Sequence, residues 1–263
     1  MESHEPIRAV TRALDVLKAI NRLRGGTLAE IARQADLPYA TCFRMVQTLI
    51  LEGLVAQEPS RKRYRVTEMV LALSSGFQAD DRLVSAARQP METFTARHLW
   101  PLALTVRVGS RMIVKYSTTS LTTQTFELYH PGDSQPIAVS SAGRAWLAHC
   151  SPEERERVLE GLTVNDPDSS LGLRMLREQT MLDEIRAQGH ACYERTPFNR
   201  TPGQTSAIAV PVMQEGRVQG CLTMTFFASA MTMTMAIDRY VGSLKDTAHA
   251  IAREMARTAR PPA

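Results

Sequence analysis

Three side chains between positions 41 and 47 have the chemistry that reads the edges of DNA bases: Thr41, Arg44 and Gln47. An arginine can donate to guanine O6 and N7 or to a phosphate, and a glutamine can pair with adenine. The threonine hydroxyl can bond a phosphate or cap a helix. These residues act together only if one surface presents all three, so the elements that position them decide the function.

A second group of candidate residues is basic and lies further along the chain. Four of the six residues from 60 to 65 are basic, among them Arg61, Lys62 and Arg63. Such a cluster neutralises backbone phosphates and releases their counterions, which adds affinity for any DNA sequence. We therefore expect specificity from residues 41–47 and affinity from the basic segment.

The first expected element is a helix near the start of the chain. Apolar residues recur in it every three or four positions, which predicts one buried stripe. The stripe would consist of Val10, Ala13, Leu14, Leu17 and Ile20. Gly25 and Gly26 should end this helix.

Two shorter helices should follow. Thr27 with Glu30 three positions later has the form of a capping box and predicts a helix start. After a tight connector over residues 36–38, a third helix begins at Pro38. Its buried stripe would be Cys42, Met45, Val46 and Leu49. The opposite face would then carry Ala40, Arg44 and Gln47, with Thr41 and Phe43 at its flanks.

Residues 54–57 and 64–67 are strand candidates joined by a basic turn. A short helix, a tight turn, a helix with a polar exposed face and a basic hairpin together form a winged helix-turn-helix, which binds double-stranded DNA. We assign it to residues 7–67. The alternative is a small packing or dimerisation domain whose basic turn is merely solvated.

The rest of the chain has a different character. We expect a linker helix over residues 68–79 and a second, mixed domain over residues 80–263. Its expected strands cover residues 102–108, 112–116, 124–129, 190–195, 206–212 and 218–227. The first two should form a hairpin that turns at Gly109 and Ser110. Its expected helices cover residues 83–99, 142–149, 152–161 and 173–188, and a long final helix has a stripe from Ile237 to Met255.

Composition excludes several classes of protein. The 263 residues are 44% hydrophobic and 22% charged, with a net charge of +4, which is typical of a folded globular chain. No apolar run is long enough to span a bilayer, and residues 1–6 lack the apolar core of a secretory signal, so we expect a cytoplasmic protein and no membrane partner. The four cysteines are far apart, which predicts neither disulfides nor a zinc ribbon.

Enzyme motifs are missing from the sequence. It has no nucleophile elbow, no Walker A loop, no dinucleotide-binding fingerprint and no zinc-protease motif. We therefore expect no catalytic residue, no metal and no cofactor. Two alternatives remain open: Cys150 beside His149 as a cysteine hydrolase pair, and His190 with Cys192 as part of a metal site.

The chain resembles the IclR family of bacterial transcriptional regulators. The resemblance covers about residues 7–258 and is carried by TRALDVL (11–17), LAEIA (28–32), LPYATCFRMVQTL (37–49), EGLV (52–55), SSAGRAWLA (140–148) and AIAVPV (207–212). The segments HCSPE (149–153) and FASAMT (227–232) look most like the subgroup that controls the catabolism of aromatic acids.

This resemblance implies an α+β protein, with an N-terminal winged helix-turn-helix joined by a helix to a GAF-like effector-binding domain. It also implies a homodimer or tetramer that binds an operator and an aromatic or other small organic acid. Family members usually carry Ser where this chain has Ala40. The expected DNA-contacting set is Thr27, Tyr39, Ala40, Thr41, Phe43, Arg44, Gln47, Arg61, Lys62 and Arg63.

The expected effector site combines three segments. Ser140, Ser141 and Ala142 would supply amides and hydroxyls at a helix N-terminus, where an anion is favoured. Thr223 and Thr225 would share one face of the last strand, although they could equally be strand threonines that bond each other. Phe198 and Asn199 would suit an aromatic carboxylate with Arg200 as its counterion, unless this loop is simply exposed.

The second hypothesis for function is a DNA-binding protein that needs no effector and whose second domain only oligomerises.

Overall fold

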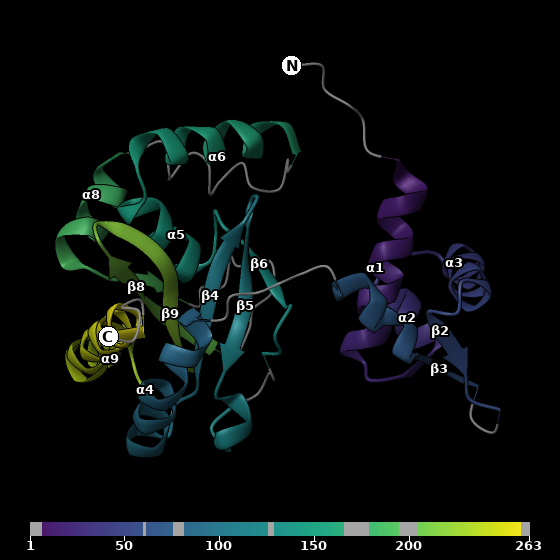
Figure 1. The fold of residues 1–263 in the computed structure, drawn as a ribbon, viewed down its shortest axis with the longest axis horizontal. Helices are drawn as coiled ribbons and strands as arrows, with labels where there is room; N and C mark the ends of the chain where they lie inside the picture. Colours follow the sequence, from purple (N-terminus) through teal and green to yellow (C-terminus); the bar gives the residue numbers. More distant parts are fainter. Residues whose placement is uncertain are drawn as a thin grey trace. The chain divides into compact units, whose positions relative to one another are not determined.

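The computed structural model describes residues 7–59, 62–75, 82–125, 129–165, 179–194 and 205–258 (Figure 1). The chain divides into two compact units, Met1–Ala79 and Asp80–Ala263. Within the described ranges, no helix combines the length and the hydropathy that a membrane crossing requires.

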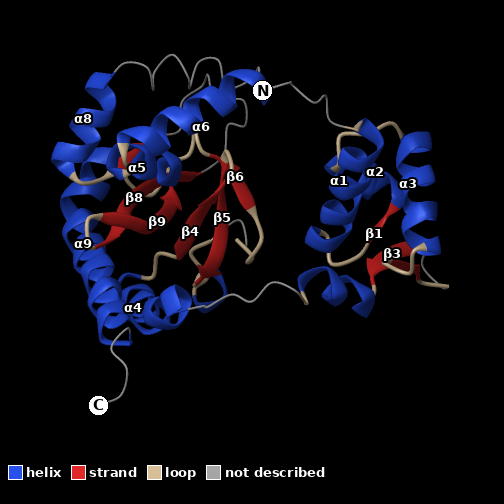
Figure 2. Ribbon diagram, turned by 45° about the horizontal axis from the view of Figure 1, so that its top comes forward, coloured by secondary structure: helices blue, strands red, loops and turns tan. Residues whose placement is uncertain are grey.

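The described part of the first unit contains three α-helices, a small sheet and a short 3-10 helix. In chain order they are α1 (Arg8–Arg22), β1 (Gly26–Thr27), α2 (Leu28–Gln34), α3 (Tyr39–Leu51), β2 (Val55–Gln57), β3 (Arg63–Val66) and η1 (Glu68–Ser74). The strands pair antiparallel in the order β1-β3-β2. Figure 2 shows β1 and β3 of this sheet beside the three helices. Strand β1 was not predicted, because two residues leave no periodic pattern. The helical segment expected after the hairpin is the 3-10 helix η1.

The helix starts follow from local hydrogen bonding. Thr27 and Glu30 form the predicted capping box at the start of α2. Asp36 has a φ of +53° in the connector, a left-handed conformation that turns the chain sharply into α3. The second and third helices therefore lie at the close spacing of a helix-turn-helix.

The core of the first unit corrects one prediction. Ile20 is buried as expected, together with Val16 and Ala19, but Val10 is 54% exposed and Leu14 is 47% exposed. Helix α1 carries two apolar stripes, because positions 14 and 16 lie about 200° apart around a helix. The side of α1 that carries Val16 and Ile20 packs on α2 and α3, with Leu17 half-buried at its edge. Periodicity predicts that a stripe exists but does not tell which of two stripes is covered.

The second unit is an antiparallel sheet between layers of helices. Its elements are α4 (Arg82–His98), β4 (Leu102–Val108), β5 (Arg111–Ser117), η2 (Thr119–Leu121), β6 (Ser134–Pro136), α5 (Ser141–His149), α6 (Pro152–Asn165), α8 (Gln179–Gln188), β7 (Ala191–Tyr193), β8 (Thr205–Gln214), β9 (Arg217–Phe227) and α9 (Met233–Thr258). The strand order is β6-β5-β4-β9-β8-β7. This mixed fold agrees with the α+β prediction.

The predicted hairpin of β4 and β5 is present and turns at Gly109, whose φ is +58°. A strand was expected over residues 124–129. Residues 124, 125 and 129 are described and lie in no strand, and residues 126–128 lie outside the described residues. Strand β6 pairs with β5 instead, at Ser134–Pro136. Turn-rich sequence around β6 hides a strand this short.

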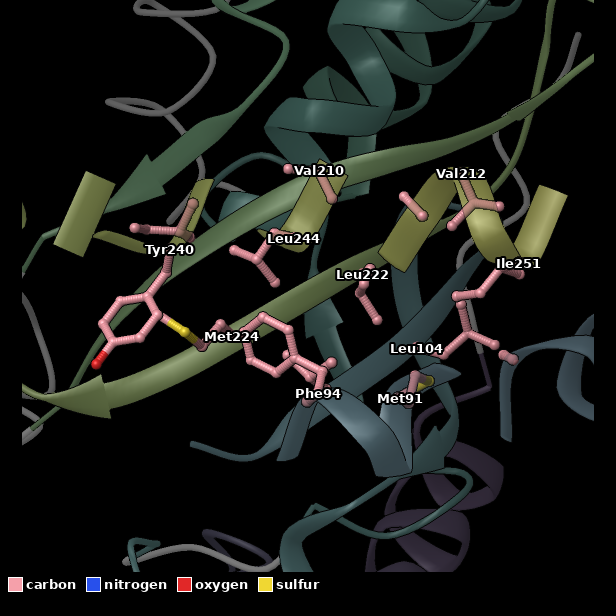
Figure 3. Close-up of a cluster of buried hydrophobic side chains, with 14 of the residues drawn as sticks. Met91, Phe94, Leu104, Val210, Val212, Leu222, Met224, Tyr240, Leu244 and Ile251 are labelled. Carbon is pink, nitrogen blue, oxygen red and sulfur yellow. The ribbon is translucent and has the colours of Figure 1, made fainter. Parts of the chain in front are cut away.

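Two cores cover the two faces of the sheet. Helices α4 and α9 pack on one face, where Figure 3 shows large side chains from both helices meeting those of the strands: Met91, Phe94, Leu104, Val210, Val212, Leu222, Met224, Tyr240, Leu244 and Ile251. Trp100 Nε1 donates to the Tyr240 hydroxyl at 3.2 Å beneath α9.

The other face lies under α5, α6 and α8, and small side chains such as Ala191 and Ala209 are prominent in it. A sheet face lined by small residues brings the helices close to the strands. The polar side chains on this face, described below, are therefore enclosed between α5 and the sheet.

Candidate nucleic-acid interface and ligand site

Helix α3 presents an exposed face whose side chains have no role in the core. Cys42, Val46 and Leu49 hold the helix against α1 and α2. On the outer side Tyr39 is 60% and Phe43 44% exposed. Ala40 and Arg44 are also exposed, and Thr41 and Gln47 are half-buried beside them. The structure thus places the predicted residues of α3 on one surface.

Thr27 is engaged within the domain. Its hydroxyl donates to Glu30 Oε2 at 3.0 Å and accepts from the Glu30 amide, and its own amide donates to Glu30 Oε2 at 2.8 Å. These hydrogen bonds from the Thr27 backbone and side chain hold the pKa of the Glu30 carboxyl below its usual value. Thr27 therefore stabilises the start of α2.

Arg63 turns inward rather than out from the wing. Its Nη2 donates to the Gly25 carbonyl at 2.7 Å, and its Nη1 lies 3.8 Å from Glu30 Oε2. We therefore remove Arg63 from the phosphate-contacting set. Composition marks the segment as basic, but the partner of this guanidinium comes from a turn 38 positions earlier in the chain.

Lys62 and Arg65 are the exposed cations in the described part of the wing. Lys62 sits at the turn with a φ of +50°, and Arg65 lies two residues beyond Arg63 on β3. Arg61 lies outside the described residues. Arg65 was missing from the predicted site, and the signal that reveals it is its exposure on a strand whose other arginine is engaged.

The segment expected to hold an anion is tightly packed. Ser140 caps α5, because its Oγ accepts from the Gly143 amide at 3.1 Å. Ser140, Ser141 and Ala142 are all buried. A Cβ on Gly143 would lie 1.9 Å from the Ile137 carbonyl oxygen, so only glycine allows this approach. The start of α5 is therefore held rigidly over the sheet.

Thr223 and Thr225 share the α5 face of β9, as predicted from the period of a strand. Thr223 lies opposite Ala103 and Ala209, and Thr225 lies opposite Ala207. Thr223 is 9% exposed, and its Oγ1 has no hydrogen-bond partner among the described residues. The alternative in which the two threonines bond each other is therefore wrong.

Thr225 is half-buried and lines a small pocket. The pocket is also lined by Pro101, Gln124, Thr125, Tyr129, Thr205, Phe226 and Phe227. Phe198, Asn199 and Arg200, which were expected to complete the effector site, lie outside the described residues. The described part of the site thus consists of the start of α5 and the two threonines of β9.

Arg144 is a site residue that the sequence reasoning missed. Its Nη1 donates to the Cys192 carbonyl at 3.2 Å, while its buried Nε has no hydrogen-bond partner within the described part of the chain. Burial lowers the pKa of this guanidinium. The available signal was an arginine within a helix that otherwise consists mainly of small and apolar residues.

The cysteines do not have the environment of a nucleophile. Burial raises the pKa of Cys150 and raises that of Cys192 to about 11, whereas a reactive thiol needs a lowered one. His149 bonds the Ala145 carbonyl through Nδ1. Among the described residues, no group of three His, Cys, Asp or Glu side chains is placed to hold a metal.

Comparison with known proteins assigns both units. Residues 9–59 match the family model of the IclR helix-turn-helix domain, and residues 80–253 match that of the bacterial transcriptional regulator IclR C-terminal domain. The HTH-type transcriptional regulator BhcR of Paracoccus denitrificans is 28% identical over 95% of this chain and 86% of its own.

Two further relatives extend the comparison. TsaQ1/TsaQ2, an HTH-type transcriptional regulator of Comamonas testosteroni, is 23% identical over 97% of this chain and 91% of its own. An IclR homologue from Microbacterium hydrocarbonoxydans, solved in complex with 4-hydroxybenzoate, has the same fold with a TM-score of 0.62. It is 22% identical to this chain, and the match covers 95% of this chain and 99% of that one.

Proposed function

Because the chain belongs to the IclR family of DNA-binding transcriptional regulators, we propose that it controls a catabolic operon in response to a small organic acid. As a regulator of this kind it acts on DNA in the cytoplasm and performs no catalysis. The exposed face of α3 carries the proposal, because its aromatic and polar side chains have no structural role in the domain.

In the proposed complex α3 lies in the major groove. Arg44 donates to guanine or to a phosphate, Gln47 pairs with adenine, and Thr41 bonds a phosphate. Phe43, Tyr39 and Ala40 make the apolar contacts of the same face. Lys62 and Arg65, with Arg61 of the same segment, bind the backbone on either side of the wing.

The effector binds between α5 and the sheet. The amides of Ser141 and Ala142 in the first turn of α5 are natural donors to an anion. The hydroxyl of Thr223 is a buried group that needs a partner. The homologue bound to 4-hydroxybenzoate supports an aromatic acid as the first candidate. Phe198 and Asn199 are carried forward as proposed contacts of the ring.

Two copies of the chain pair through α1. Ile7, Val10 and Leu14 form an exposed apolar stripe and are 72%, 54% and 47% exposed. A second copy of the same stripe would cover it, as expected for a symmetric dimer. Paired heads read two half-sites, and the effector favours one head spacing by its different affinity for the two arrangements.

The test combines DNA selection with effector binding. Rounds of selection from a random duplex library should yield an operator with two related half-sites. The affinity for it should change when an acid that raises the melting temperature is added. A ligand at 100 times its dissociation constant stabilises by about 2.7 kcal/mol, a shift of several degrees. Operator binding that no acid changes would favour an effector-independent protein.

A further inference from the structure

Arg144 is half-buried with a fully enclosed Nε atom, and it has no counter-charge among the described residues. Within the described part of the chain, its guanidinium donates a hydrogen bond only to the Cys192 carbonyl, and no carboxylate forms an ion pair with it. Two other arginines of the α5, α6 and α8 layer are differently placed: Arg155 Nε donates to Leu147 O at 3.0 Å, and Arg186 binds both Ala148 O and Asp183. An enclosed N–H group without an acceptor is unfavourable, so the Nε of Arg144 needs a partner that the described residues do not supply.

Thr223 is a second residue with a buried polar atom that has no hydrogen-bond partner in the described structure. Every other buried threonine has a hydrogen-bond partner in the described structure, namely Thr95, Thr105, Thr118, Thr119 and Thr247. Only the Nε of Arg144 and the Oγ1 of Thr223 are buried side-chain N or O atoms without a partner in the described part of the chain.

Arg144 and Thr223 both lie on the α5 side of the sheet. Strand pairing aligns Ala191, Ala209 and Thr223 in one row, and Tyr193, Ala207 and Thr225 in the next. Arg144 reaches the β7 end of these rows through the Cys192 carbonyl, and the threonines are at the β9 end. Two strand spacings, about 10 Å, separate the ends.

The β8 side chains between the two ends are small. In these two rows β8 contributes only Ala207 and Ala209. Ala207, Thr225 and Tyr193 are half-buried, whereas Ala209 and Thr223 are buried. A small molecule lying across β8 would therefore reach a cation at one end and a hydroxyl at the other. Arg144 can give a carboxylate two parallel hydrogen bonds from its fork of donors.

We infer that Arg144 binds the carboxylate of the effector and that Thr223 binds a second polar group of the same molecule. The ligand class is a monocarboxylate that carries a hydroxyl or oxo group at its far end. This inference rests on the proposed effector site and specifies its chemistry. It replaces the earlier expectation that Arg200 supplies the counterion.

Calorimetric titration of the full-length chain tests the inference. The probes are 4-hydroxybenzoate and benzoate, with 4-hydroxybenzamide as the uncharged match, and 3-hydroxybutyrate with its amide as the aliphatic arm. The wild type should bind an acid of one arm at least about tenfold more tightly than its amide. Arg144→Gln should lose at least about thirtyfold in affinity for that acid. The affinity of Arg144→Lys should lie between those of the wild type and Arg144→Gln, because lysine retains the charge but lacks the forked donors of the guanidinium.

Two variants separate binding from structure. Thr223→Val should weaken the hydroxy acid about threefold to tenfold and leave benzoate unchanged, if the aromatic arm binds. Arg155→Gln removes a partnered arginine of the same layer and should bind the acid as the wild type does. Ligand-free Arg144→Met should melt at or above the wild-type temperature, whereas a purely structural arginine would lower it when replaced.

Three results would overturn the inference. If Arg144→Gln binds the acid as tightly as the wild type, Arg144 is not the anchor, while the proposed effector site stands. If the wild type prefers the amides, the ligand is not a carboxylate. If no acid binds, the inference and the proposed effector class both fail, and DNA binding is judged separately from the operator measurements.

Discussion

The Nη2 atom of Arg63 donates to the Gly25 carbonyl at 2.7 Å and so joins the wing strand β3 to the turn before α2. A hydrogen bond from a charged donor contributes about 1.5–3 kcal/mol, with the lower end expected here because Arg63 is partly exposed. Arg63→Ala should therefore lower the free energy of unfolding of the first unit by about 1–2 kcal/mol.

Far-UV circular dichroism in a urea titration measures this loss. Both tryptophans, Trp100 and Trp146, lie in the second unit, so their fluorescence should report an unchanged transition. Arg65→Ala removes an exposed arginine of the same strand and should leave both transitions unchanged. Equal losses for the two variants would show that the contact with Gly25 has no special role.

Lys62 should act on DNA affinity without acting on stability. It is exposed at the turn of the wing. Lys62→Ala should weaken binding to all DNA sequences alike and reduce the slope of log affinity against log salt by about one. Fluorescence anisotropy at several salt concentrations measures both quantities. A loss confined to one sequence would instead assign Lys62 to a base contact.

The exposed stripe of α1 should hold two copies of the chain together. Leu14→Glu places a charge in that stripe and should shift the chain toward the monomer in sedimentation velocity experiments. Leu51→Glu is the matched control, because Leu51 is 87% exposed at the end of α3 and lies outside the stripe. If Leu14→Glu sediments as the wild type does, the pairing surface lies elsewhere.

His149 should make the second unit sensitive to acid. Burial lowers its pKa, and the nearby cations Arg186 and Lys245 lower it further, although the bond to Ala145 opposes them. The unfolded chain therefore binds a proton more readily, so the free energy of unfolding should fall as the pH drops below 6.5. Burial lowers the pKa of His98 and His190 in the same sense.

Urea midpoints from tryptophan fluorescence between pH 7.5 and 5.5 measure this effect. His149→Gln should reduce the fall without abolishing it, because His98 and His190 remain. His249→Gln, an exposed position on α9, should follow the wild-type profile. A His149→Gln profile parallel to that of the wild type would contradict the assignment.

The sequence predicted the elements that rest on local rules. The capping box of Thr27, the buried stripe of α3 and the turn at Gly109 each depend on a few neighbouring residues, and each is present. The stripe of α1 was only partly correct, because choosing between two apolar faces requires knowing what packs on them. Val10 and Leu14 lie on the apolar face that remains exposed.

The site was harder to predict, since its chemistry depends on distant partners. The engagement of Arg63 by Gly25 and the isolation of Thr223 appear only when strands far apart in the chain are paired. Arg144 meets Cys192 across 48 positions, so no local pattern marks it as a ligand residue. Strand period did predict correctly that Thr223 and Thr225 share a face.

The most direct test of the central claim is the affinity of Arg44→Ala for a selected operator and for a scrambled duplex at one salt concentration, measured by fluorescence anisotropy. The account predicts that this variant loses roughly 1–3 kcal/mol of discrimination between the two, with little change on the scrambled duplex. Equal losses on both duplexes would contradict the placement of α3 in the major groove.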